Sequence, residues 1–152
     1  MIAKAVRITH RNFIFRILPA IAFAAALSPA LRAEDWPAWR GPRGDGTSIE
    51  KSVPVKWSAA ENVVWKVPLP GKGHASPIVW ADRIFLVTAI EDEEHRILLS
   101  LDRKTGKTLW QRTVLVAPPE KINKLNSHAS STPATDGEKI YVSFLDRDKM
   151  FV

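Results

Sequence analysis

The fold is decided by the stretch Ser100-Leu101-Asp102-Arg103-Lys104-Thr105-Gly106-Lys107-Thr108-Leu109-Trp110. It predicts a β-strand, a tight polar turn and a second strand that reaches a large aromatic residue. Asp102 can accept hydrogen bonds from backbone amides two residues further on, and Gly106 allows the positive φ that short hairpins often need. The indole of Trp110 would then lie against an adjacent sheet. Hairpins of this kind occur in many β-proteins, so the rest of the chain has to decide the architecture.

The first 33 of the 152 residues differ in composition from the rest. They hold five basic residues and no acidic residue, and they include an apolar run of eleven residues from Ile17 to Leu27. Small residues follow this run, as they do in a secretory signal peptide. A membrane-spanning helix needs about 20 apolar residues, so a retained N-terminal anchor is the weaker alternative. The sequence predicts a signal peptide at residues 1–33 and a periplasmic or secreted protein, which meets the membrane only through targeting.

The charge of the chain comes mostly from this N-terminal segment. The formal net charge is +6, and five of these positive charges lie in residues 1–33, which leaves about +1 for the remainder. A nucleic-acid partner is not expected, because it would require a basic patch on the folded part. The chain has no cysteine. This excludes disulfides, thiolate metal sites, cysteine nucleophiles and lipid attachment to an N-terminal cysteine.

Residues 34–61 are expected to form an arm rich in tryptophan, glycine and proline. Between Asp35 and Gly46 the prolines and glycines are too dense for a long helix or a regular strand. The same stretch holds Trp36 and Trp39, whose large indoles favour burial. The prediction is therefore an irregular arm that packs both tryptophans on the body.

From residue 62 onward the sequence favours short strands separated by polar turns. No stretch after residue 33 has helical periodicity, so an all-β meander is expected. β-branched and aromatic residues predict a strand at 62–69, glycines predict a turn at 71–73, and acidic residues predict a solvated loop at 91–94. Four further strands are expected at 74–79, 83–88, 97–102 and 107–114.

Two parts of the sequence repeat each other in order. Pro77 and Pro133 stand 56 residues apart, and each is followed six residues later by a basic residue, an isoleucine and an aromatic residue. The tripeptide His-Ala-Ser precedes the proline in both parts, at 74–76 and at 128–130. The repeat therefore covers both the start and the second strand of each unit.

A tryptophan repeats as well. Trp65, in Val-Trp-Lys, and Trp110, in Leu-Trp-Gln, lie 45 residues apart. A four-stranded unit that recurs at about 45 residues is typical of a β-propeller blade. The longer spacing between the two prolines is explained by residues 117–127, which lengthen the connection into the second unit.

The opening stretch resembles the tryptophan-docking pattern Ala-x-Asp-x-x-Thr-Gly-x-x-x-Trp of pyrroloquinoline-quinone (PQQ) repeat propellers. The matching residues are Ser100, Asp102, Thr105, Gly106 and Trp110, with serine in place of the usual alanine. The resemblance implies that these residues are a structural docking motif and that the fold is a β-propeller of four-stranded antiparallel blades. A small serine should still admit the neighbouring indole.

The arm is similar to the opening of secreted PQQ-like propeller proteins of planctomycete-type bacteria, so the resemblance covers nearly all of residues 35–152. It implies about two blades in residues 62–152, the second of them incomplete, with Trp110 packing against the next blade. Residues 62–67 would complete the last blade of the ring. Because propellers typically have four to eight blades, the chain is expected to be an N-terminal fragment of a longer, monomeric propeller. A ring made from several short chains is the alternative.

The resemblance implies two classes of function. The first is a non-catalytic binding or scaffold module for a protein or glycan of the cell envelope. The second is a PQQ-dependent dehydrogenase that oxidises an alcohol or a sugar, with the quinone held over a calcium ion. The family's enzymes commonly use a vicinal cysteine pair, a calcium-binding carboxylate and a catalytic aspartate. Since no such set is recognisable, no catalytic, cofactor-binding or metal-binding residue is assigned, and no cofactor is expected outside the second class.

The repeat-level resemblance extends to the propeller lipoprotein of the outer-membrane β-barrel assembly machinery. That lipoprotein is normally anchored through a lipidated cysteine, which this chain lacks.

A set of small polar residues and histidines recurs at equivalent places on the innermost strand of each unit. Its members are His74, Ser76, His128, Ser130 and Ser131. One hypothesis is that they face the central channel and form a polar ring that contacts a ligand. The alternative is that small polar residues merely fit the crowded inner strand. A histidine and a serine without a third group to orient them are weak evidence for nucleophilic catalysis.

Overall fold

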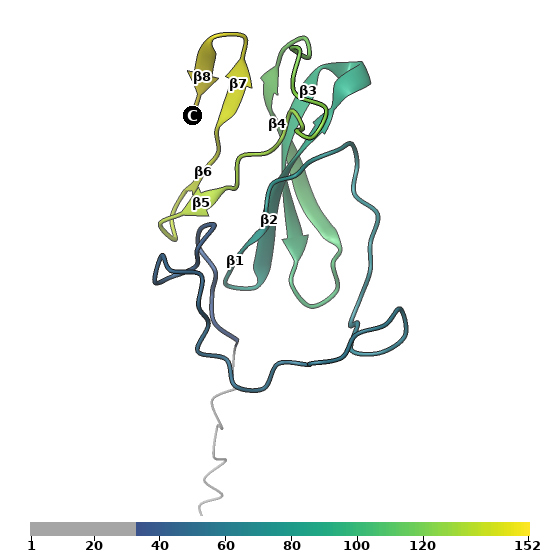
Figure 1. The fold of residues 1–152 in the computed structure, drawn as a ribbon, viewed down its shortest axis with the longest axis vertical. Coiled ribbons are helices and arrows are strands. Elements are labelled where there is room, and N and C mark those ends of the chain that lie inside the picture. The colour runs from purple at the N-terminus through teal and green to yellow at the C-terminus, as the bar shows by residue number, and fades with distance from the viewer. Residues whose placement is uncertain (1–32) are drawn as a thin grey trace, which may run out of the picture. The chain divides into compact units, whose positions relative to one another are not determined.

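The computed structural model describes residues 33–152, so the predicted signal peptide lies outside the described residues except for Ala33 (Figure 1). Within this range the chain forms β-strands and one short 3-10 turn, and no α-helix. The part of the chain that the structure describes contains no helix long and apolar enough to span a membrane. The all-β prediction is confirmed.

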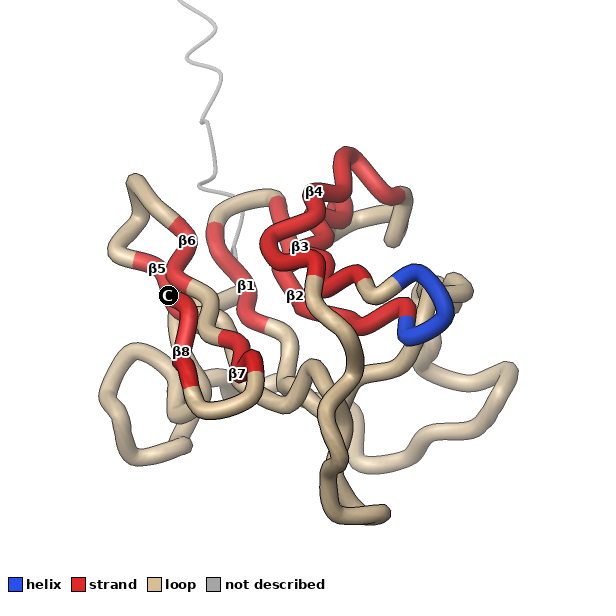
Figure 2. The backbone as a smooth tube through the Cα atoms, turned by 90° about the horizontal axis from the view of Figure 1, so that it is seen from above, coloured by secondary structure: helices blue, strands red, loops and turns tan. Residues whose placement is uncertain are grey.

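The strands form one four-stranded antiparallel sheet, in the order β1-β2-β3-β4, and two hairpins, β5-β6 and β7-β8. From above, the two hairpins lie beside the sheet (Figure 2). The bounds of the elements are β1 (Ile78–Trp80), β2 (Arg83–Ile90), η1 (Glu91–Glu93), β3 (His95–Asp102), β4 (Thr108–Val116), β5 (Ala134–Thr135), β6 (Ile140–Tyr141), β7 (Phe144–Asp146) and β8 (Lys149–Phe151).

The predicted hairpin at residues 100–110 is the connection between β3 and β4. One carboxylate oxygen of Asp102 accepts hydrogen bonds from the amides of Lys104 (3.1 Å) and Thr105 (2.8 Å) and from the Thr105 hydroxyl (2.7 Å). Gly106 has a φ of +71° and donates its amide to the Asp102 carbonyl at 2.8 Å. An aspartate that closes the turn and a glycine in the left-handed region are what the sequence predicts here.

The outer strand β4 carries two irregularities. Its register against β3 skips one residue between Thr108 and Trp110 and another between Thr113 and Leu115. The skipped residues, Leu109 and Val114, are both exposed. Bulges at a sheet edge interrupt the regular row of hydrogen-bonding groups that another chain could pair with. β4 is therefore a poor template for edge-to-edge association.

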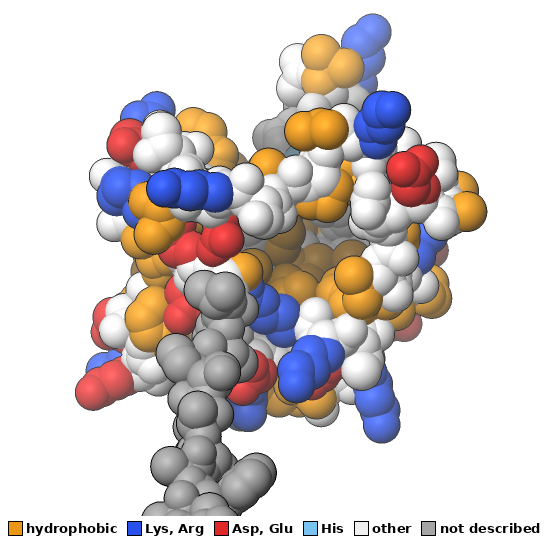
Figure 3. Space-filling view, turned by 90° about the horizontal axis from the view of Figure 1, so that it is seen from below, with side chains coloured by type: hydrophobic (Ala, Val, Ile, Leu, Met, Phe, Trp, Pro, Cys, Tyr) orange, Lys and Arg blue, Asp and Glu red, His pale blue; other side chains and the backbone are white. Residues whose placement is uncertain are grey.

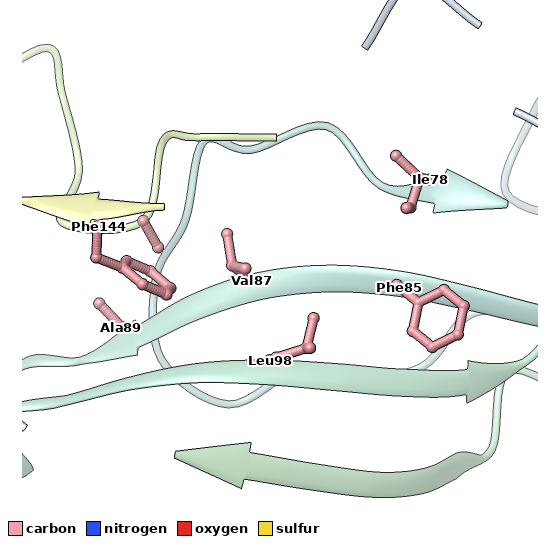
Figure 4. Packing of buried hydrophobic residues seen from close by; sticks show 7 residues of the cluster. Ile78, Phe85, Val87, Ala89, Leu98 and Phe144 are labelled. Atoms are coloured by element: carbon pink, nitrogen blue, oxygen red, sulfur yellow. The ribbon is translucent and has the colours of Figure 1, made fainter. Parts of the chain in front are cut away.

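The main core lies on one face of the sheet, between β2 and the second unit. Alternate residues of β2, Phe85, Val87 and Ala89, are buried there together with Leu98 of β3. Phe144 of β7 points into the same cluster from the second unit (Figure 4). Alternation along β2 thus assigns one set of side chains to the contact between the two units.

One predicted strand is wrong and another begins too early. Residues 62–69 are extended but pair with no strand, and the strand predicted at 74–79 begins only at Ile78, the first residue of β1. A strand is stabilised by a neighbour, and no described segment lies in register beside 62–69. At the predicted turn 71–73 the chain bends, with Gly71 at a φ of +70°, and Lys72 exchanges two backbone hydrogen bonds with Ala89 at 2.8 and 2.9 Å.

The arm is irregular, as predicted, and it is attached through Trp36. This residue exchanges two backbone hydrogen bonds with Val79 of β1, at 2.7 and 2.9 Å, and its ring lies over Gly41. The predicted burial of both tryptophans is wrong for Trp39, which is 64% exposed. The Arg40 guanidinium lies 5.0 Å from the centre of the Trp39 ring and provides its contact instead.

Candidate functional site

The inner ends of the two repeated units lie directly against each other. The amides of His74 and Ala75 both donate to the Ala129 carbonyl, at 3.0 and 3.1 Å. The Ser76 amide donates to the Thr132 hydroxyl at 3.2 Å. The two His-Ala-Ser segments therefore meet at one junction between the units, and most of the predicted polar set lies at or beside it.

His128 is held at this junction through both ring nitrogens. Nδ1 lies 3.0 Å from the Glu91 carboxylate and Nε2 lies 2.8 Å from the Glu120 carbonyl oxygen, and the side chain is 7% exposed. Both partners are hydrogen-bond acceptors. Because both nitrogens are engaged, His128 in this arrangement has no ring nitrogen available to activate a serine hydroxyl.

Glu91, at the start of η1, is a structural partner and not simply part of a solvated acidic loop. Its second oxygen lies 3.5 Å from the ammonium of Lys72. The hydrogen bond with His128 lowers the pKa of the Glu91 carboxyl, and the positive charge of Lys72 lowers this pKa further. The prediction of a solvated loop at 91–94 is therefore wrong for this residue.

Arg96 of β3 supports the same junction from within the protein. Its side chain is fully buried, with one terminal nitrogen 3.4 Å from the Glu120 carboxylate and the other 3.4 Å from the Ala117 carbonyl. These contacts hold the segment that leads into the second unit. A buried guanidinium with a paired carboxylate is strongly destabilised when one partner is removed.

The serines of the second unit bond to one another. The Ser127 and Ser130 hydroxyls lie 3.0 Å apart, and the His74 amide donates to the Ser127 hydroxyl at 3.0 Å. Ser130 also donates to the Asn126 side-chain oxygen. The Ser131 hydroxyl lies 2.6 Å from that of Ser143. These hydroxyls join neighbouring segments of the second unit and hold the chain where this unit begins.

The structure thus brings the two His-Ala-Ser segments together. The ring of His128, however, bonds to Glu91 and Glu120 and not to a serine. His74 lines a separate cavity beside β2. That these residues face the channel of a complete propeller stays a prediction. The pairing of Arg96 with Glu120 was not predicted from the sequence, because a charged residue in an apolar strand and another in a loop form no recognisable motif. The sequence did contain one indication, since an arginine at a strand position expected to be buried needs a partner.

The expected docking residues lie in the ladder of β3 and β4 and on the turn that joins these two strands. Ser100 is fully buried and stands in the ladder between Phe85 and Trp110, whose ring centres are 6.0 Å apart. On the turn, the ring of Trp65 lies over Gly106, and its Nε1 donates to the Arg103 carbonyl at 3.1 Å. The small residues at 100 and 106 therefore leave room for two large indoles.

Asp102 is electrostatically stabilised by the same turn. The hydrogen bond from the Thr105 hydroxyl and then that from the Thr105 amide hold the pKa of the Asp102 carboxyl below its ordinary value. Across residues 33–152 no group of three or more histidine, cysteine, aspartate or glutamate side chains is placed to hold a metal ion. We assign no residue in this range to calcium or to PQQ.

Comparison with known families agrees with this architecture. A PQQ-repeat family model, described as outer membrane protein assembly factor BamB, matches residues 53–148. The chain belongs to this family. No curated protein and no solved structure gives a significant match.

The family match identifies the two units of the structure. In the BamB-type PQQ-repeat family, the sheet β1–β4 is a propeller blade, and β5–β8 form part of a second one. The PQQ-repeat resemblance and the all-β propeller fold class are confirmed. The planctomycete type, the secretion and the role of the docking motif stay predictions.

Proposed function

We propose that this chain is an extracytoplasmic β-propeller module that binds or scaffolds a partner and is not an enzyme. The observation that carries the proposal is that His128, the side chain of the junction best suited to acid-base chemistry, spends both ring nitrogens on contacts within the protein. His128 is buried and bonded on both nitrogens to Glu91 and Glu120. Side chains used in this way support a rigid body, whereas a general base needs a nitrogen that can reach a substrate.

The partner is a protein or a glycan of the cell envelope. The description of the matching family, an outer membrane protein assembly factor, supports a partner in that compartment. The N-terminal segment, with its basic residues, its apolar run and its small residues, supports export from the cytoplasm. A remaining charge of about +1 gives little attraction to nucleic acid.

A cofactor experiment tests the non-enzymatic part of the proposal. The full chain is mixed with PQQ and calcium, and absorbance of bound quinone and dye reduction with an alcohol or a sugar are measured. We expect no stoichiometric quinone binding and no substrate-dependent reduction. Cofactor-dependent oxidation would overturn the proposal in favour of a PQQ-dependent dehydrogenase.

Export is tested with a reporter. Residues 1–33 are fused to a phosphatase that is active only outside the cytoplasm, and Ala22→Asp interrupts the apolar run in the control. We expect phosphatase activity from the first fusion and its loss in the second. An inactive first fusion would contradict the extracytoplasmic location.

A further inference from the structure

One histidine ring joins three segments of the chain at the junction between the two units. His128 begins the second His-Ala-Ser segment, Glu91 begins η1 between β2 and β3, and Glu120 lies in the connection between β4 and β5. The contacts of its two nitrogens, 3.0 Å to the Glu91 carboxylate and 2.8 Å to the Glu120 carbonyl oxygen, are hydrogen-bond distances. The ring is therefore a direct link from the second unit to the first blade.

The protonation state of this ring decides how many of the two bonds it can make. A neutral imidazole carries one N–H and donates to one acceptor, whereas an imidazolium carries two. The Glu120 carbonyl can only accept. The Glu91 carboxyl also only accepts, because the hydrogen bond with His128 and the charge of Lys72 lower its pKa and keep it ionised at neutral pH. The protonated ring is thus the form that satisfies both partners as they are placed.

The surroundings of the ring make a lost bond costly. The side chain of His128 is 7% exposed, so little water is available to replace a partner. The charged groups around it come from four segments. Lys72, before β1, lies 3.5 Å from the second oxygen of Glu91, and Arg96 of β3 lies 3.4 Å from the carboxylate of Glu120. The ionised Glu91 beside an imidazolium offsets the cost of burying its charge.

Charged side chains at the surface are in a different situation. Seen from below, basic and acidic side chains lie around the outside of the molecule, with hydrophobic side chains in the hollow between them (Figure 3). Such exposed charges interact weakly, because water and salt screen them. His95 and Glu93 form an ion pair of this kind, with Nδ1 3.3 Å from the carboxylate and side chains 35 and 60% exposed. This pair has the same chemistry as His128 and Glu91 without the burial.

We propose that the junction between the two units is pH-dependent, and that it is held most firmly when His128 is protonated and Glu91 is ionised. Histidine is the side chain whose charge ordinarily changes between about pH 5 and pH 8. Opening of the junction frees the ring from both acceptors, so closure and protonation of the ring favour each other. The inference concerns the body of the protein and does not depend on its partner or its location.

The direction of the response follows from the two groups. A free histidine titrates near about pH 6.5 and a free glutamate near about pH 4.3. The contribution of the His128 charge is complete below about pH 6.5 and is lost as the pH rises above it. Because the pKa of Glu91 is lowered in the closed junction, the contribution of its charge is complete above about pH 4.3 and is lost as the pH falls. The junction should be tightest between these values.

Glutamine variants of the full chain test the proposal, since glutamine keeps a polar side chain and has no charge at any pH. The variants are His128→Gln, Glu91→Gln and, as a matched control, His95→Gln. Amide hydrogen exchange is measured by mass spectrometry at about pH 5.5 and about pH 8, on either side of the value for free histidine. Correction for the intrinsic exchange rate gives the opening equilibrium of β5–β7, and β2 and β3 serve as the internal reference.

We expect opening of β5–β7 to increase about tenfold from the lower to the higher pH in the wild type and in His95→Gln, because one hydrogen bond to a charged group is lost. Opening of β2 and β3 should change little. The response should be weaker in Glu91→Gln and absent in His128→Gln. A wild type that opens equally at both pH values would overturn the proposal, whatever the variants do. So would an unchanged response in His128→Gln, or its loss in His95→Gln.

Discussion

Gly106 combines two requirements that only glycine meets. Its φ is +71°, and a Cβ atom at this position would lie 2.5 Å from Cε3 of Trp65. Gly44 has nearly the same φ, +70°, but nothing lies within 4 Å of the corresponding position. The two glycines therefore separate the effect of backbone strain from the effect of the contact with the indole.

We expect Gly44→Ala to cost about 1 kcal/mol of unfolding free energy, for the left-handed backbone alone. Gly106→Ala should cost about 3 kcal/mol, because the indole must also move. Urea unfolding followed by tryptophan fluorescence measures both. Equal losses in the two variants would show that Trp65 does not pack on this turn.

Asp136 stabilises the turn between β5 and β6 through its charge. It accepts hydrogen bonds from the amides of Lys139 (2.8 Å) and Glu138 (2.9 Å) and from the Tyr141 hydroxyl (2.7 Å). These bonds lower the pKa of Asp136 to about 2, and the bond from the Lys139 amide has the largest effect. An aspartate in an unfolded chain has a pKa of about 3.9. The stabilising effect of the Asp136 charge is therefore complete above that pH and is lost as the pH falls toward about 2.

We therefore expect Asp136→Asn to remove part of the acid sensitivity of folding between pH 4 and pH 2, a window set by these two values. Thermal unfolding at a series of pH values measures this. Asp148→Asn, in the exposed turn between β7 and β8, is the control. A wild type and an Asp136→Asn variant with parallel pH profiles would contradict the role of this carboxylate.

At the scale of the element, Trp110 joins the outer strand β4 to the core. Its ring contacts that of Phe85 across the small Ser100, and it shares a cavity of about 410 Å³ with Gly137 and Ile140 of the second unit. We expect Trp110→Ala to lower the unfolding free energy by about 2–3 kcal/mol. Trp39→Ala, at an exposed indole, should change it by less than about 0.5 kcal/mol. Unchanged thermal unfolding of Trp110→Ala would show that this side chain does not join β4 to the core.

The elements that the sequence predicted well are those held by interactions between residues close together in the chain. The turn between β3 and β4 was predictable because Asp102 and Gly106 act within a few residues of each other. Residues 62–69 have strand composition but form no ladder, because a strand also requires a neighbour that composition does not reveal. The skipped residues Leu109 and Val114 were missed for a similar reason, since register is set by packing against β3.

The candidate site was predictable in part. Repetition of His-Ala-Ser identified the segments that meet, and the Ala129 carbonyl does join them. It did not reveal that His128 bonds to Glu91, 37 residues away, or that Arg96 reaches Glu120. Such pairs are formed by the fold, and no local spacing encodes them.

At the scale of the whole molecule, the first blade and the second unit are joined by a small number of polar contacts beside the apolar cluster around Phe144. His128 bonds to Glu91, Arg96 bonds to Glu120, and the His74 segment bonds to Ala129. Sheet β1–β4 has its own ladder and does not depend on these bonds. The second unit has only short two-stranded hairpins, which are marginal when isolated.

Loss of His128 should therefore loosen the second unit while the first blade stays closed. A hydrogen bond to a charged group contributes about 1.5–3 kcal/mol, and each 1.4 kcal/mol is about tenfold in an opening equilibrium. We expect His128→Ala to accelerate amide hydrogen exchange in β5–β7 about ten- to a hundredfold, with little change in β2 and β3. His95→Ala is the control, since His95 is partly exposed and lies 3.3 Å from the exposed Glu93. Equal acceleration in β2, β3 and the second unit would mean that the two units open as one body and that His128 does not hold a separate joint.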